Sequence, residues 1–137
     1  MPAHMYQMHQ PHSLDHFASV ARNTVRALPD AFREPARAVA LCVADWPSQE
    51  MLHNLEISDP LDLTGLYEGT PMTVKSVWDQ PAQPDTVWLF REPILAEWRA
   101  RKPVQLDELI AHVTIHEFAH HFGWSDADIA RIDRWWE

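Results

Sequence analysis

The chain has 137 residues, of which 46% are hydrophobic and 23% are charged, a balance typical of one soluble globular domain. Its formal net charge of −9 argues against a nucleic-acid-binding surface, which needs Lys and Arg to displace counterions. Its single cysteine, Cys42, allows neither an internal disulfide nor a multi-cysteine zinc site, and no apolar run approaches the length of a membrane span.

The N-terminal segment, residues 1–12, combines prolines, glutamines and histidines without an apolar period. We predict that it is a flexible tail and that residues 13–137 form a single domain. The segment has no basic stretch followed by an apolar one, so we expect no signal peptide and a cytoplasmic location.

Helices and strands are then predicted in turn along the first half of the chain. Apolar residues at helical spacing indicate a helix over 14–28, capped by Ser13. A short helical turn over 30–33, an apolar strand within 36–45 and a short helix over 48–55 follow. Beyond residue 55, turn-forming residues become frequent.

The second half begins with a turn-rich segment over 58–72, followed by strands predicted over 74–78 and 85–90. A helix is expected from Arg91 onward, and a long helix over about 104–122. Strands in the middle of the chain with helices on both sides indicate the α+β class, a small sheet packed with helices.

The long helix carries the motif H-E-x-x-H within the stretch HEFAHHFGWSD, residues 116–126. His116 and His120 are four residues apart, so both imidazoles lie on one face of a helix and can bind one tetrahedral zinc ion. Glu117 is turned by about 100° around the helix and can reach a water molecule bound to that metal. The pattern therefore predicts a Zn²⁺ site with Glu117 as general base.

A third ligand is predicted just beyond the helix. Gly123 can end the helix in a left-handed conformation, and the turn can return the Asp126 carboxylate to the metal. His112 is a rival ligand, but it is about 12 Å along the axis from His120, too far to share one ion. His121 is interpreted as a residue behind the ligands or on the surface. The alternative to a metal site is that these histidines lie in the core or on the surface without metal.

This block resembles the small bacterial zincin-like metallopeptidases, the minimal matrix-metalloprotease-like domain family. The resemblance rests on HEFAHHFGWSD together with GLYEGTPM and PDTVWLFREPIL, and it covers most of residues 14–130. It implies a compact zincin-like fold, zinc peptidase activity, metal at His116, His120 and Asp126, and Glu117 as the base. The chain departs from the larger metzincins, because an aspartate stands where they usually have histidine and residues 127–137 contain no methionine for a Met-turn.

The predicted function is a zinc metallopeptidase that acts on a peptide or protein substrate, with no nucleic-acid or membrane partner. Tyr67, within GLYEG, is a candidate oxyanion donor. Two alternatives stay open. One is a metal-binding scaffold without turnover, for which the seven tryptophans could form a partner surface. The other is a zinc-dependent endoribonuclease, which Glu117 and the net charge disfavour. The sequence leaves the oligomeric state unknown.

Overall fold

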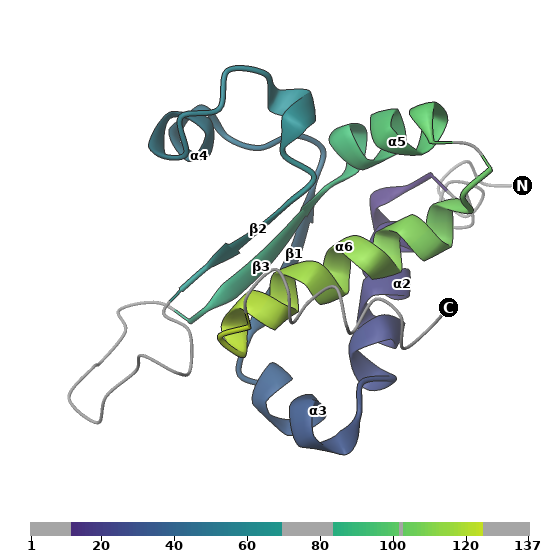
Figure 1. The fold of residues 1–137 in the computed structure, drawn as a ribbon, viewed down its shortest axis with the longest axis vertical. Helices are drawn as coiled ribbons and strands as arrows, with labels where there is room; N and C mark the ends of the chain where they lie inside the picture. The colour runs from purple at the N-terminus through teal and green to yellow at the C-terminus, as the bar shows by residue number, and fades with distance from the viewer. Residues whose placement is uncertain (1–11, 70–83, 102, 125–137) are drawn as a thin grey trace, which may run out of the picture.

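The computed structural model describes residues 12–69, 84–101 and 103–124. Along the described chain the elements follow in this order: α2 (Leu14–Arg26), α3 (Asp30–Ala36), β1 (Ala40–Ala44), α4 (Gln49–Asn54), the 3₁₀-helix η1 (Pro60–Asp62), β2 (Gly65–Glu68), β3 (Thr86–Phe90), α5 (Arg91–Ala100) and α6 (Leu106–His121). The predicted α+β class is confirmed: a small sheet lies against the long helices α2 and α6 (Figure 1).

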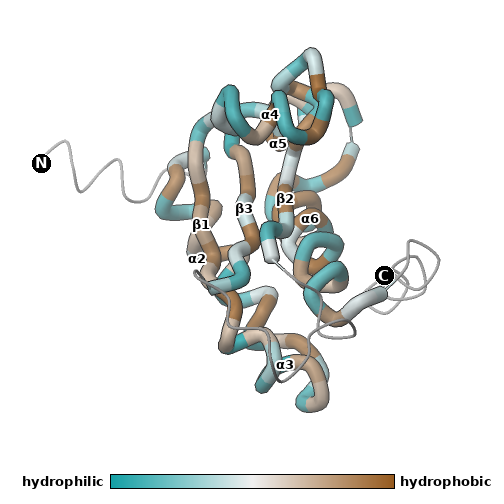
Figure 2. Tube along the Cα trace, turned by 90° about the vertical axis from the view of Figure 1, so that its left-hand side faces the viewer, coloured by the Kyte–Doolittle hydropathy of each residue, from teal (hydrophilic) through white to brown (hydrophobic). Residues whose placement is uncertain are grey.

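Among the described residues the sheet has three strands in the order β1-β3-β2, which Figure 2 shows side by side. β3 is central: it pairs in parallel with β1, with Leu41 opposite Val87, and antiparallel with β2, with Tyr67 opposite the same Val87. Among the described residues, β2 therefore forms one edge of the sheet and pairs only with β3.

Helix α2 follows directly from its sequence. The Ser13 side chain accepts a hydrogen bond from the backbone N–H of His16, which satisfies one of the free donors at the helix start. Phe17 and Ala21 are four residues apart and both fully buried, so one stripe of the helix packs into the core. This stripe contacts α6, and the two helices lie on the same face of the sheet (Figure 1).

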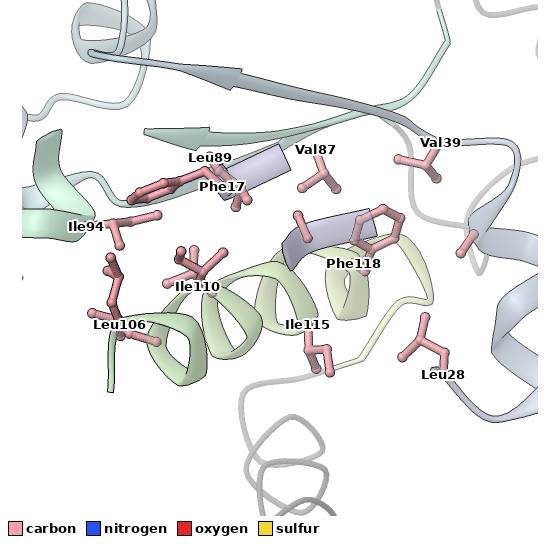
Figure 3. Packing of buried hydrophobic residues seen from close by; sticks show 14 of the residues in the cluster. Phe17, Leu28, Val39, Val87, Leu89, Ile94, Leu106, Ile110, Ile115 and Phe118 are labelled. Carbon is pink, nitrogen blue, oxygen red and sulfur yellow. The ribbon is translucent and has the colours of Figure 1, made fainter. Parts of the chain in front are cut away.

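The main core lies between the sheet and α6. Val87 and Leu89 are two residues apart on β3, so their side chains lie on the same face of the sheet, and both are fully buried. Ile110 and Phe118 of α6 belong to the same cluster, and Figure 3 shows all four side chains in the layer between strands and helix. Each such side chain stabilises the fold by roughly 1.5–3 kcal/mol relative to an exposed position.

A smaller cluster covers the other face of the sheet at the end of β3. Phe90 is fully buried there, with Leu52 of α4 and Leu63, which follows η1. This cluster holds the α4–η1 segment against the sheet, and that segment leads directly into the edge strand β2.

The predictions for α2, α4, β1, β3, α5 and α6 are confirmed, with bounds that differ by a few residues. The turn-rich interpretation of 58–72 was incomplete, because Gly65–Glu68 form β2. Pairing with β3 over only four residues overrides the weak strand preference of a glycine-containing stretch. The predicted strand over 74–78 lies outside the described residues. In the described part of the chain, no helix is both long and apolar enough to cross a membrane.

Candidate active site

The two histidines of the motif lie on successive turns of α6, as predicted. The ring centroids of His116 and His120 are 5.1 Å apart, their planes make an angle of 81°, and both side chains are half-buried. Two imidazoles on one face of a buried helix are the kind of nitrogen donor pair that zinc takes from protein, so these residues fit the ion.

The third predicted ligand, Asp126, lies outside the described residues. Within residues 12–69, 84–101 and 103–124, no group of three His, Cys, Asp or Glu side chains is placed to hold a metal ion. Gly123 does end the helix as predicted, since its φ is 77°, in the left-handed region that glycine adopts freely. The described site is therefore the helix-borne part: His116, Glu117 and His120.

Glu117 is packed against the edge strand. Its carboxylate accepts a hydrogen bond from the backbone N–H of Tyr67. Burial raises the pKa of Glu117 to about 7, because desolvation disfavours the charged form, and the bond from Tyr67 opposes this only in part. A carboxyl group held in this way can exchange a proton near neutral pH.

One edge of β2 faces β3 and the other faces away from the sheet, and Glu117 contacts the edge that faces away. Phe90 N–H donates to Thr64 O, so Thr64 and Leu66 turn their backbone polar groups toward β3. Because these bonds alternate along an antiparallel pair, Gly65 and Tyr67 turn theirs away from the sheet. The outer edge of β2 thus presents hydrogen-bonding groups beside α6.

Gly65 permits the close approach of α6 to this edge. A Cβ atom at this position would lie 2.8 Å from Val113 Cγ1 and 2.9 Å from Glu117 Cγ. Both distances are below those of ordinary contacts, so a larger residue would push the strand and the helix apart. The glycine therefore sets the spacing between Glu117 and the edge strand.

Two open cavities flank Glu117. One has a volume of about 460 Å³ and is lined by Tyr67, Glu117, His120 and Trp124, among others. The second has about 330 Å³ and is lined by His112 and His116 as well as Glu117. Glu117 borders both, so it lies where a chain running along β2 would pass from one cavity to the other.

A buried polar cluster of Tyr67, Asp85 and His121 adjoins the first cavity, and of these three residues only Asp85 was not singled out from the sequence. The Tyr67 hydroxyl donates to Asp85 Oδ2 over 2.8 Å, and His121 Nδ1 lies 3.1 Å from the same oxygen. The exposed fractions of Asp85 and His121 are 4% and 3%, so a surface position for His121 is wrong. A carboxylate directly before an apolar strand was the only sequence signal for Asp85.

A family comparison agrees with this geometry. The model of the zincin-like metallopeptidase family matches residues 36–136, well over half of the chain. The chain belongs to the zincin-like metallopeptidase family. This zincin-like domain carries the motif on α6 and presents β2 beside it. No curated protein matches the chain significantly.

Proposed function

We propose that this zincin-like protein is a zinc-dependent peptidase, with His116, His120 and Asp126 as metal ligands and Glu117 as general base. One observation carries the proposal: the carboxylate of Glu117 touches the outer edge of β2 and lies one residue from a histidine pair that fits zinc. Within the family, that combination supports peptide-bond hydrolysis more directly than the histidine motif alone.

A zinc ion at this site would supply Lewis acidity and lower the pKa of a water molecule to near neutrality. Glu117 would take the proton as water attacks the peptide carbonyl carbon, and pass it to the nitrogen of the leaving amine. In the metal-free protein, burial raises the pKa of this carboxyl group to about 7.

The substrate would bind as an extended strand along the outer edge of β2. The backbone groups of Gly65 and the Tyr67 carbonyl face that side and are hydrogen-bonding partners that an added strand requires, while the Tyr67 N–H is bound to Glu117. The cavities on either side of Glu117 would receive substrate side chains that flank the cleaved bond. Backbone pairing of this kind is tolerant of sequence, so specificity would come from the cavity linings.

The oxyanion role of Tyr67 stays a prediction. Its hydroxyl donates to Asp85, and burial followed by the hydrogen bond to Asp85 raises the pKa of Tyr67. The group therefore stays protonated and remains a donor. To serve the oxyanion, it would have to leave the Asp85 carboxylate.

Metal content of the purified protein is the first test. We expect about one zinc per chain by elemental analysis and loss of that zinc in His116→Ala. Asp126→Ala tests the third ligand and should weaken zinc binding. A matched control is His53→Ala, since His53 is an exposed histidine on α4. If the wild-type protein binds no zinc even after zinc is added, the proposal fails.

Turnover is the second test. A mixed peptide library should be cleaved by the wild-type protein and left intact by Glu117→Gln, which should still bind zinc. Full peptidase activity in Glu117→Gln would contradict the role of the base. Zinc-dependent cleavage of RNA, or a stable complex with another protein and no hydrolysis of any peptide, would support the alternative functions instead.

A further inference from the structure

The polar cluster formed by Tyr67, Asp85 and His121 joins the three elements that build the site. Tyr67 lies on the edge strand β2, Asp85 directly precedes β3, and His121 is the last residue of α6. Both side chains meet one carboxylate oxygen, because the Tyr67 hydroxyl donates to Asp85 Oδ2 over 2.8 Å and His121 Nδ1 lies 3.1 Å from the same atom. The hydroxyl is also 3.2 Å from His121 Nδ1, so the three groups form a closed triangle.

The surroundings hold Asp85 in one place. Its side chain is almost fully buried, and a buried carboxylate is tolerated only when hydrogen bonds compensate for lost water. Gly69 leaves room for it: a Cβ atom at that position would lie 2.9 Å from Asp85 Cβ and still closer to its carboxylate. Directional bonds to a fixed carboxylate restrict both partners more tightly than apolar contacts can.

Tyr67 transmits this restriction to the site. Its hydroxyl is bound in the cluster, while its backbone N–H donates to Glu117. His121 transmits it from the other side, because it directly follows His120 on the same helix. The cluster therefore acts on the proposed base through the strand and on a proposed ligand through the helix.

We propose that Asp85 is a positioning residue, which clamps Tyr67 of β2 and His121 of α6 and so sets the distance between the edge strand and the metal-binding helix. Its relevance to metal binding and catalysis rests on the proposed peptidase function. In the described part of the chain, Asp85 bonds to Tyr67 and His121 rather than to His116, His120 or Glu117. Its proposed effect on those residues is exerted through Tyr67 and His121.

The first measurement needs no metal. Amide hydrogen exchange of the Tyr67 N–H in chelator-treated protein reports the contact between β2 and Glu117, because that N–H faces away from β3. We expect exchange to become about tenfold faster in Asp85→Ala, with partial recovery in Asp85→Asn, which keeps the shape and removes the charge. Tyr67→Phe removes only the hydroxyl and should give an intermediate change; it serves as the test if Asp85→Ala does not fold.

The second measurement is zinc affinity in competition with a chelator, with the visible spectrum of the Co²⁺-substituted protein. Asp85→Ala should weaken zinc binding by about tenfold, because residues that hold metal ligands in place typically contribute this much to affinity. It should also alter the Co²⁺ spectrum. Thr114→Val is the matched control: it removes a buried hydroxyl of α6 that donates to Ile110 O over 2.7 Å, outside the cluster. It should change thermal stability and leave both readouts near wild type.

The outcomes separate the two proposals. Wild-type exchange and wild-type zinc affinity in the Asp85 variants would overturn the positioning role of Asp85, whether or not peptides are cleaved. The positioning role is also overturned if Tyr67→Phe lowers kcat while exchange and zinc affinity stay unchanged, because the hydroxyl would then act on the substrate. If the wild-type protein binds zinc but cleaves nothing, the proposed peptidase function fails and the positioning role is still decided by exchange and affinity.

Discussion

Helix α6 is held against the sheet in two different ways. Along most of its length, apolar side chains such as Ile110 and Phe118 pack against Val87 and Leu89 of β3. At its last turn the contact is polar, through His121 and the buried Asp85 carboxylate. The first region is large and made of non-directional contacts, whereas the second, among the described residues, is a triangle of polar groups.

In this small domain, one kind of contact supplies most of the stability and another fixes the position of α6. Apolar burial supplies most of the folding free energy, and such contacts tolerate small shifts of the helix. Hydrogen bonds between buried polar groups contribute less net stability, but they fix distance and angle. The proposed active site lies at the polar end of α6, where fixed geometry matters most.

The largest effect should come from breaking the apolar region. Ile110→Ala should lower the free energy of unfolding by about 2–5 kcal/mol, because Ile110 is fully buried and the cavity would refill only in part. Urea unfolding of the metal-free protein measures this. Leu61→Ala, at an exposed leucine, is the control and should change little. A loss below about 1 kcal/mol in Ile110→Ala would contradict the assigned core.

A smaller effect is expected where the strand and helix approach most closely. Gly65→Ala should reduce stability by about 1–3 kcal/mol, since the new methyl group would overlap Val113 and Glu117 side-chain atoms. It should also lower peptidase activity by moving β2 from Glu117. Adding Val113→Ala should recover part of the stability, and a double-mutant cycle from urea unfolding measures the coupling. Strictly additive losses would show that the two residues do not meet.

The next effect is the pH dependence of stability that Glu117 causes at the polar end of α6. The pKa of Glu117 is raised to about 7, so its protonated form is favoured by the fold. This contribution to stability is fully present below the ordinary carboxyl pKa and is lost as pH rises through about 7. Glutamine stays neutral, so metal-free Glu117→Gln should match wild type near pH 5 and be more stable by about 1–2 kcal/mol at pH 8. Thermal unfolding at both pH values decides this, and a difference independent of pH would contradict the raised pKa.

The smallest effect is expected at an exposed ion pair near the opposite end of α6. His16 Nε2 lies 2.7 Å from Asp107 Oδ1, where 59% of the Asp107 side chain is exposed. Asp107→Asn should lower the free energy of unfolding by no more than about 1 kcal/mol, because solvent and salt screen such a pair. Urea unfolding at low and at high salt measures it. A loss as large as that of Ile110→Ala would contradict the view that this exposed pair contributes little.

The helical part of the site was predictable because its signals are local. The four-residue spacing of His116 and His120 and the helix end at Gly123 depend on neighbours within two turns, and both were found as expected. The edge strand β2 was missed because its main signal is its pairing with β3. That pairing joins residues far apart in the chain, and no local pattern encodes it.

The amino-acid sequence by itself determined that α6 forms, which face carries the two histidines, and that Glu117 lies beside them. Only the tertiary structure decided which strand approaches Glu117, that Gly65 sets the spacing, and that Tyr67, Asp85 and His121 meet. The physical reason is range: helix geometry repeats every few residues, so it can be read from spacing. Contacts between β2, β3 and α6 depend instead on how separate apolar faces pack together.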